Sequence, residues 1–263
     1  MNARNLFNLE GKVAVVTGGT GHLGRSMSEG LAEAGAHVYI TSRDKEKALI
    51  TKNSFSNEIE DKVDVEVLDN LSTESVKNCF NRIKNNSNKI DILVNNAGYV
   101  SSADFENMSE EDWENGINGT INGVFRCTRE VIPIMEKNGE GNIINISSMY
   151  GKVSPDPSIY EDSLLNSLPN YGAGKAAVIQ YTRFLACHLA KKRIRVNSVS
   201  PGPFPQEEVQ QNIEFINRLK KKIPMGRIGL PHELKGVIVF LASNASSFIT
   251  GENILVDGGW TAW

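Results

Sequence analysis

The chain has 263 residues, a length that suits one large α/β domain as well as two small ones. A formal net charge of −3 and a pI of about 5.9 give no positive surface for nucleic acid or for an anionic membrane. No stretch approaches the roughly 20 apolar residues of a membrane span, and no apolar segment follows the first residues as a signal peptide would require. Three cysteines, far apart and outside any metal-type spacing, predict a reduced, cytoplasmic protein without a bound metal.

The first strong pattern lies between Lys12 and Gly35. Val13 to Val16 is a short apolar run typical of a buried strand. It is followed by Thr17 to Gly24, with four glycines in eight residues, and then by apolar residues at helical spacing. Glycines let a backbone approach a pyrophosphate, and a helix N-terminus offers free N–H groups and partial positive charge. The pattern predicts a nucleotide site; an ordinary tight turn is the alternative.

Strand and helix signals alternate along the rest of the chain. Strands are expected at 38–40, 63–67, 90–94, 143–146, 194–199 and 254–256, and helices at 72–83, 110–135, 171–191, 206–223 and 231–241. Such alternation favours a parallel sheet covered by helices on both faces. The sequence shows no repeat, no low-complexity tract and no interdomain linker. We therefore expect one doubly wound α/β domain over residues 1–263.

The end of the second expected strand addresses the choice of cofactor. In dinucleotide-binding folds an acid at this position holds the ribose 2′-hydroxyl, whereas an arginine accommodates a 2′-phosphate. Ser42 stands about where the acid would be, and Arg43 follows it. Because a guanidinium pairs well with phosphate, the sequence favours NADP(H) over NAD(H), unless Arg43 is a surface charge with no ligand.

Polar residues also follow the fourth and fifth expected strands. Asn95 to Gly98 suits the ligand crevice at the carboxyl edge of an open sheet, or simply a turn.

Tyr171 and Lys175 lie one turn apart on one helix face. An ammonium beside a phenol favours the phenolate, so we expect Lys175 to lower the pKa of Tyr171 and make it a usable proton donor and acceptor. The alternative is a buried tyrosine and an unrelated surface lysine.

Six motifs occur in order and at suitable spacing: Thr17-Gly18…Gly24, Asn95-Asn96-Ala97-Gly98, Ser148, Tyr171-x-x-x-Lys175, Pro201-Gly202 and Val256-Asp257-Gly258-Gly259. Together they resemble the short-chain dehydrogenase/reductase family from about Leu9 to Trp260. The resemblance implies a single Rossmann-type domain with a seven-stranded parallel sheet. It also implies a nicotinamide cofactor across the carboxyl edge, and hydride transfer between that cofactor and a carbonyl or alcohol.

The resemblance also implies roles for particular residues. Tyr171 would be the general acid in reduction and the base in oxidation, and Ser148 would hydrogen-bond the substrate oxygen as charge develops on it. Lys175 would hold the nicotinamide ribose. Thr120 stands where the family has a fourth catalytic residue, an asparagine. The implied cofactor-binding residues are Gly18, Thr20, His22, Leu23, Ser42, Arg43, Asn70, Leu71, Asn95, Ala97, Gly98, Tyr171, Lys175, Pro201, Gly202 and Phe204.

Four departures from the family pattern stand out. His22 replaces the second glycine of the turn, Thr120 replaces the asparagine of a water-linked proton relay, and Pro203-Phe204-Pro205 replaces a threonine that usually meets the nicotinamide amide. The fourth departure is a gap of 23 residues between Ser148 and Tyr171, longer than is usual. Tyr160 lies nearer the usual distance, but Leu164 stands at its lysine position, so Tyr171 is preferred.

The extra residues predict a substrate loop at about 152–170, and the stretch at about 203–223 is either a mobile lid or a fixed surface helix. Asp156, Ser158, Glu161, Asp162 and Asn166 would give the loop a polar lining, unless they are simply solvated. The leading hypothesis is thus an oxidoreductase for a small polar carbonyl or alcohol, such as a sugar, polyol or sugar acid. The alternatives are a cofactor-binding protein without redox turnover, and a non-redox reaction on the same fold.

Self-association as a homodimer or homotetramer is implied by the resemblance. The candidate faces are the helices at 110–135 and 171–191, and the segment 231–263. The latter ends in Trp260-Thr261-Ala262-Trp263, and burial at a subunit contact would explain so aromatic a tail.

Overall fold

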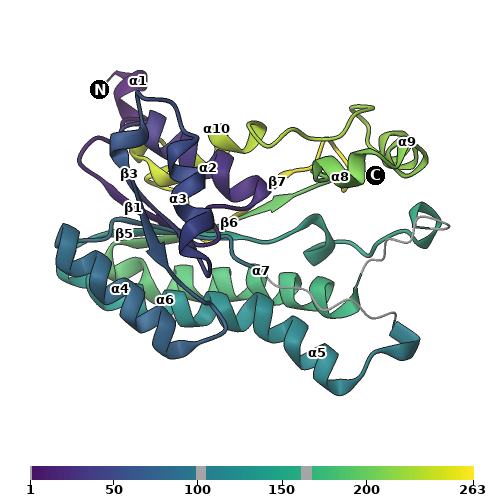
Figure 1. The fold of residues 1–263 in the computed structure, drawn as a ribbon, viewed down its shortest axis with the longest axis horizontal. Coiled ribbons are helices and arrows are strands. Elements are labelled where there is room, and N and C mark those ends of the chain that lie inside the picture. The colour runs from purple at the N-terminus through teal and green to yellow at the C-terminus, as the bar shows by residue number, and fades with distance from the viewer. Residues whose placement is uncertain (1, 99–104, 161–167) are drawn as a thin grey trace.

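Seven strands form one parallel sheet in the computed structural model, which describes residues 2–98, 105–160 and 168–263 (Figure 1). The strands are β1 (Val13–Val16), β2 (His37–Ser42), β3 (Val63–Val67), β4 (Ile92–Asn95), β5 (Gly141–Ile146), β6 (Ile194–Pro201) and β7 (Asn253–Val256). Their order in the sheet is β3-β2-β1-β4-β5-β6-β7. Strands β1 to β3 are added toward one edge of the sheet and β4 to β7 toward the other, so the order of addition switches between β1 and β4. In parallel sheets a ligand crevice opens at the carboxyl edge beside such a switch. The expected seven-stranded Rossmann-type fold is confirmed.

Helices cover both faces of the sheet. They are α1 (Ala3–Leu6), α2 (His22–Glu33), α3 (Lys45–Asn53), α4 (Thr73–Ser87), α5 (Glu110–Ile117), α6 (Gly123–Asn138), α7 (Pro169–Leu189), α8 (Glu207–Gln210), α9 (Ile213–Lys222) and α10 (Glu233–Ala242). Figure 1 shows α2, α3 and α10 above the sheet and α4, α6 and α7 below it. Among the described residues, no helix is both long and apolar enough to cross a lipid bilayer.

Successive residues of the central strands enter opposite cores, because side chains alternate across a strand. Ala14 and Val16 pack in the cluster that α2 and α10 cover. Val13 and Val15 pack in the cluster that α4, α6 and α7 cover. Since both faces are covered, the strands are continuous apolar runs.

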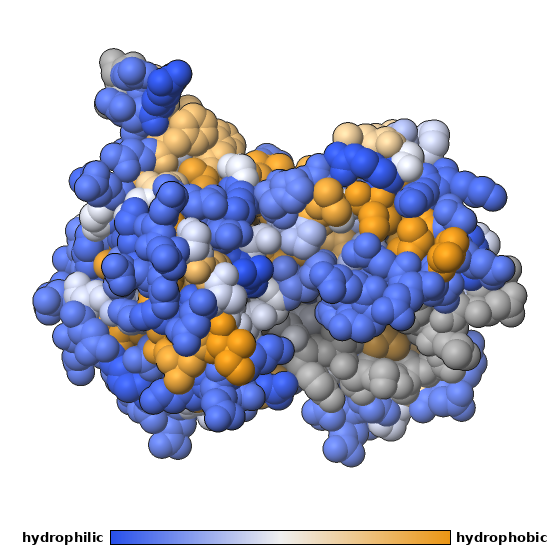
Figure 2. All heavy atoms as spheres, turned by 45° about the horizontal axis from the view of Figure 1, so that its top comes forward, coloured by the Kyte–Doolittle hydropathy of each residue, from blue (hydrophilic) through white to orange (hydrophobic). Residues whose placement is uncertain are grey.

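A third apolar cluster lies beyond the carboxyl edge of the sheet. It consists of Met149, Ile159, Phe215, Ile216, Leu219, Ile223 and Trp260. Trp260 is therefore buried within its own chain, so its apolar character needs no subunit contact, whereas Trp263 is 76% exposed. Figure 2 shows further apolar side chains at the surface on the side of the molecule that carries α8 and α9, where Ile213 and Met225 are exposed.

Two expected helices differ from the prediction. The helix expected at 110–135 contains a π-helical turn over Asn118–Asn122, between α5 and α6. The helix expected at 206–223 is two helices, because the side chain of Asn212 accepts a hydrogen bond from the Phe215 N–H and starts α9 anew. Helix α3 was not expected, because it buries only Ala48 and Thr51 and so has little apolar periodicity.

Candidate active site

The glycine-rich turn between β1 and α2 brings three backbone segments into close contact. Gly18 has a φ of +62°, a conformation that favours glycine. A Cβ atom at Gly24 would lie 2.2 Å from the Gly18 carbonyl oxygen, so no side chain fits there. His22 begins α2, and its Nε2 is buried without a hydrogen-bond partner. Histidine at position 22, where the family has a glycine, therefore leaves the tight turn intact. It adds a ring nitrogen, Nε2, that has no hydrogen-bond partner.

A cavity of about 440 Å³ opens beside this turn. Ten of the residues expected to bind a cofactor line it: Gly18, Thr20, His22, Leu23, Ser42, Arg43, Asn70, Ala97, Gly98 and Phe204. Six further residues line it: Gly21, Gly24 and Asn96, which lie within the predicted glycine-rich and Asn95–Gly98 stretches, and Lys47, Leu68 and Gln206, which were not expected. Of these, Lys47 is on α3, the helix that was not expected.

The cavity fits the diphosphate and ribose portions of a dinucleotide. Its floor is backbone at positions where side chains are excluded, and the N-terminus of α2 supplies free N–H groups. Asn70 also lines it, and its buried Nδ2 has no hydrogen-bond partner. A buried amide without a partner is unfavourable, and a polar ligand would satisfy it.

Six residues of the expected set lie outside this cavity: Asn95, Leu71, Pro201, Gly202, Tyr171 and Lys175. Asn95 instead donates to Thr128 Oγ1 at 3.1 Å and to Asn145 Oδ1 at 2.8 Å. Its amide thus joins β4 to β5 and α6, which corrects its expected place beside the cofactor. Gly202 permits a close approach of chains, since a Cβ there would lie 2.6 Å from the Asp257 Cα.

The end of β2 is positively charged where it meets the cavity. Ser42, Arg43 and Lys47 all line the cavity at this end. The acid between Arg43 and Lys47, Asp44, accepts a hydrogen bond from the Lys47 N–H at 3.1 Å and caps α3. The cavity here therefore presents cations and a hydroxyl.

The three residues expected to react with substrate converge at the carboxyl edge of the sheet. Ser148 follows β5, and Tyr171 lies in the first turn of α7. Their side chains share a hydrogen bond. Lys175 is buried, its Nζ donates to the Ile146 carbonyl oxygen at 2.8 Å, and it lies 5.6 Å from the centre of the Tyr171 ring. The structure thus brings together a hydroxyl, a phenol and an ammonium.

Burial dominates the protonation of this group. It raises the pKa of Tyr171, and the hydrogen bond from Ser148 only partly opposes it. Burial also lowers the pKa of Lys175 to about 8. The expectation that Lys175 would pull the Tyr171 pKa down is therefore wrong here, because the buried site disfavours both charges. Tyr171 is a protonated phenol at neutral pH, the form that can donate a proton.

The Thr120 hydroxyl bonds within its own helix. Its Oγ1 donates to the Gly116 carbonyl oxygen at 2.8 Å. A Cβ atom at Gly174 would lie 2.0 Å from that Oγ1, so α7 packs directly on the π-helical turn. Thr120 thus supports the helix that carries Tyr171, and a catalytic role for it stays a prediction. The nearby Asn118 accepts a hydrogen bond from Arg126 at 2.7 Å.

The described part of the substrate loop contacts α9 through an ion pair and an aromatic contact. Asp156 forms an ion pair of 3.1 Å with Lys222. The Tyr160 hydroxyl lies 2.5 Å from the Tyr150 hydroxyl, and its ring centre lies 5.7 Å from that of Phe215. The expected polar lining is thus mixed with aromatic surface. Glu161, Asp162 and Asn166 lie outside the described residues.

Comparison with known proteins agrees with this geometry. A family model described as enoyl-(acyl carrier protein) reductase matches residues 20–261. The 3-oxoacyl-(acyl-carrier-protein) reductase of Aquifex aeolicus is 37% identical over 255 residues, which cover 96% of this chain and 98% of that protein. The 2-dehydro-3-deoxy-D-gluconate 5-dehydrogenase of Dickeya dadantii is 37% identical over 267 residues, which cover 98% of each.

A solved structure is similar over its whole length. It is a gluconate 5-dehydrogenase from Burkholderia cenocepacia, in complex with NADP and tartrate, with a TM-score of 0.88, 31% identity and 100% coverage of both chains. The family match, the parallel sheet and the convergence of Ser148, Tyr171 and Lys175 agree. The chain belongs to the short-chain dehydrogenase/reductase family and is an NAD(P)-dependent oxidoreductase.

Proposed function

We propose that this enzyme uses NADP(H) to interconvert a hydroxyl and a carbonyl group of a sugar acid. The bound cofactor would supply or accept the hydride at its nicotinamide ring. Gly18, His22, Asn70 and the N-terminus of α2 would hold its diphosphate and ribose portions. The hydrogen-bonded pair of Ser148 and Tyr171, with Lys175 buried beside it, carries the proposal.

The roles of the reacting residues follow from their contacts. In reduction, the protonated Tyr171 phenol donates its proton to the substrate oxygen, and in oxidation the phenolate takes it back. The Ser148 hydroxyl donates a hydrogen bond to the same oxygen as negative charge develops on it. Lys175 places a cationic group against the Tyr171 ring, where it would also meet the nicotinamide ribose.

Relatives support a sugar acid as the substrate. The Dickeya dadantii and Burkholderia cenocepacia proteins are named for dehydrogenation of gluconate-type acids, whereas the Aquifex aeolicus protein is named for a carrier-bound acyl chain. In this chain the described side of the substrate loop carries Asp156 paired with Lys222, together with two tyrosine hydroxyls. Such a mixed polar and aromatic surface suits a small hydroxylated molecule better than a long acyl chain.

Preference for NADP(H) rests on Arg43 and Lys47, which line the cavity where Asp44 is occupied in capping α3. Parallel fluorescence titrations with NADPH and NADH test it. NADPH should bind at least about tenfold more tightly, a difference of roughly 1.4 kcal/mol. Arg43→Ala and Lys47→Ala should each weaken NADPH binding and leave NADH binding nearly unchanged.

Lys45→Ala is the matched control, because Lys45 is on the same helix but is not among the residues that line the cavity. Equal affinities of the wild type for NADPH and NADH would contradict the cofactor preference. Product formation without any change in nicotinamide absorbance would contradict hydride transfer itself.

The protein is also proposed to self-associate through the face formed by α6 and α7. Phe125 and Phe184 are 44% and 59% exposed on this face, and the Tyr181 ring lies between them, 6.4 and 6.5 Å from their ring centres. Exposed aromatic surface of this kind is typical of interfaces. Light scattering should give a dimer or tetramer of the 28.9-kDa chain. The three free cysteines, Cys79, Cys127 and Cys187, suit the cytoplasmic location that we propose.

A further inference from the structure

A second cavity, of about 600 Å³, lies at the amino edge of the sheet, away from the reacting residues. Its walls are the first residues of β5 and β6, the residues just before them, and the segment 242–250 that joins α10 to β7. None of the residues assigned to the cofactor or the substrate lines it. A volume of this size is within the usual range of small-molecule sites, about 300–1,000 Å³. The proposed function leaves this cavity without a role.

Asn142, the second residue of β5, brings an unpaired amide oxygen to this cavity. The residue is 5% exposed and lines the cavity. Its Nδ2 donates to the Leu241 carbonyl oxygen at the end of α10, whereas its Oδ1 is buried and has no hydrogen-bond partner. A buried acceptor without a donor is unfavourable. A ligand with an N–H group in the cavity would supply that donor.

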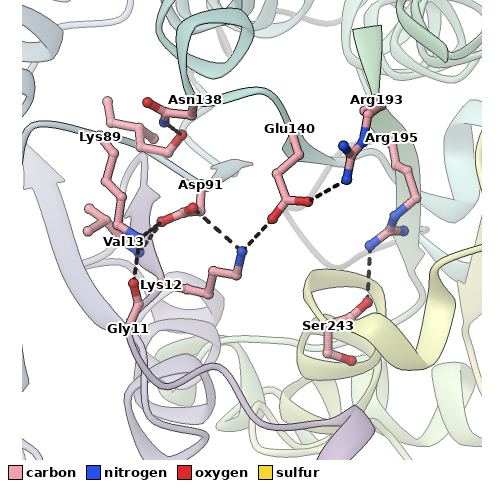
Figure 3. Close-up of polar contacts among 11 residues, drawn as sticks. Gly11, Lys12, Val13, Lys89, Asp91, Asn138, Glu140, Arg193, Arg195 and Ser243 are labelled. Atoms are coloured by element: carbon pink, nitrogen blue, oxygen red, sulfur yellow. Dashed lines mark hydrogen bonds and ion pairs between the residues drawn. The ribbon is translucent and has the colours of Figure 1, made fainter. Parts of the chain in front are cut away.

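The charged residues around the cavity favour an anion. The cations that line it are Lys12, Arg193 and Arg195, and the carboxylates are Asp91 and Glu140. Both carboxylates already have a lysine partner, because Lys12 Nζ lies 2.7 Å from Glu140 and Lys89 Nζ lies 3.0 Å from Asp91 (Figure 3). The Arg193 side chain is 76% exposed, and its guanidinium lies 3.6 Å from Glu140 without a hydrogen bond to the described residues. Arg193 can therefore pair with an incoming anion.

The wall of the cavity holds an aromatic ring in solvent. Phe248 lines the cavity and is fully exposed. The ring cannot easily fold inward, because the Arg195 guanidinium anchors the backbone around it. Arg195 donates at 3.0–3.2 Å to the carbonyl oxygens of Leu241, Ser243 and Ile249 and to the Ser246 hydroxyl. A flat ligand ring stacked on Phe248 would remove this apolar surface from water.

We propose that the amino-edge cavity binds a small anion that carries a flat ring with an N–H donor. The anionic group would pair with the Arg193 guanidinium, and the ring would stack on Phe248. The ring N–H would donate to Asn142 Oδ1. A nucleoside monophosphate and an aromatic carboxylic acid both have this chemistry. Because the site is at the opposite edge of the sheet from Ser148 and Tyr171, this ligand and the substrate can be bound together.

Calorimetry on the NADP⁺-saturated enzyme tests the proposal, because saturation fills the cavity where a nucleotide would otherwise replace the cofactor. AMP is the probe for a nucleotide and indole-3-acetate the probe for an aromatic acid. At least one should bind with a Kd below about 1 mM, and the tighter of the two identifies the source.

Matched analogues remove one feature of the ligand at a time. Adenosine and indole-3-acetamide lack the charge. Nebularine 5′-monophosphate, which is AMP without its amino group, and naphthalene-1-acetate lack the N–H donor. Each should bind at least about tenfold more weakly than its parent probe. An uncharged analogue that bound as tightly as its parent would overturn the role of Arg193, and with it the proposal.

Arg193→Met and Phe248→Ala should each weaken binding of the tighter probe at least about tenfold. Both side chains are exposed, so the urea unfolding midpoints should stay close to the wild-type value. Lys191→Met is the control, because Lys191 is an exposed cation two residues from Arg193 that does not line the cavity. Failure of both probes to bind, unchanged binding in both variants, or an equal loss in Lys191→Met would overturn the inference.

Discussion

At the scale of single residues, desolvation rather than charge pairing governs the site. Tyr171 and Lys175 are adjacent, yet burial raises the pKa of the phenol and lowers that of the ammonium to about 8. Each group is pushed toward its neutral form. A neutral phenol that shares a hydrogen bond with Ser148 is already in the protonation state needed to reduce a carbonyl. The residue-level design therefore favours proton donation from Tyr171.

Replacing Tyr171 by phenylalanine tests this assignment. The change removes the hydroxyl and keeps the ring that packs against Lys175, so the fold and cofactor cavity should survive. Turnover should fall by about 10² to 10⁴-fold, the usual contribution of a positioned acid or base. NADPH affinity should change by less than about twofold, as measured by fluorescence titration.

Tyr160→Phe is the control for that experiment. Tyr160 is the tyrosine whose distance from Ser148 along the sequence is nearer the family's usual gap, and its hydroxyl meets that of Tyr150. The Tyr160→Phe variant should therefore retain most of the wild-type turnover. If Tyr160→Phe were the inactive variant and Tyr171→Phe the active one, the two assignments would have to be exchanged.

At the scale of elements, the position of Tyr171 depends on how α7 meets the helix before β5. The π-helical turn over Asn118–Asn122 places Thr120 against Gly174, where no Cβ atom fits. Asn170 is packed as closely, since a Cβ at Gly116 would lie 2.2 Å from its Nδ2. These two contacts, one just before Tyr171 and one just before Lys175, fix α7 along its first two turns.

Gly174→Ala should therefore destabilise the protein although alanine is the better helix former. The new Cβ would lie 2.0 Å from Thr120 Oγ1, and forced overpacking of this kind costs about 1–3 kcal/mol. Gly236→Ala in α10 is the control, because nothing lies within 4 Å of its Cβ position. It should stabilise by about 0.5–1 kcal/mol. Urea unfolding midpoints measure both, and a stabilised Gly174→Ala would show that this packing is looser than it is drawn.

The same elements show which features of the fold and site could be predicted from the sequence and which could not. Apolar runs such as Val13–Val16 located the central strands, because burial on both faces leaves a clear signal, and alternation of apolar and acidic residues located β3. The spacing of Tyr171 and Lys175 located the reacting pair, since local helix geometry fixes their relation. The π-helical turn left no mark in a pattern read at 3.6 residues per turn, and Asn212 interrupts an apolar periodicity that continues past it. Asn95 was misplaced because side chains from distant strands, not its own neighbours, take its amide.

At the scale of the whole molecule, two groups of polar residues lie at opposite edges of the sheet. The reacting groups gather at its carboxyl edge, and charged residues gather at its amino edge (Figure 3). There Lys12 lies 2.7 Å from Glu140 and 3.6 Å from Asp91, and Arg193 lies 3.6 Å from Glu140. These residues immediately precede β1, β5, β4 and β6, four neighbours in the sheet order. The network therefore joins the amino ends of the strands whose carboxyl ends build the site.

Acidification should weaken this network. The hydrogen bond and charge of Lys12 hold the pKa of Glu140 below its ordinary value of 4.5. A carboxylate whose pKa is lower in the folded protein stabilises it above the unfolded pKa, and that stability is lost as the pH falls through the folded pKa. Because both side chains are partly exposed, a Lys12→Met and Glu140→Gln double-mutant cycle should give a coupling free energy of only about 0.2–1 kcal/mol at pH 7. Urea unfolding should show this coupling intact at pH 6 and declining as the pH falls below 4.5 through the folded pKa; a coupling that did not change with pH would mean that the pair is not held by charge.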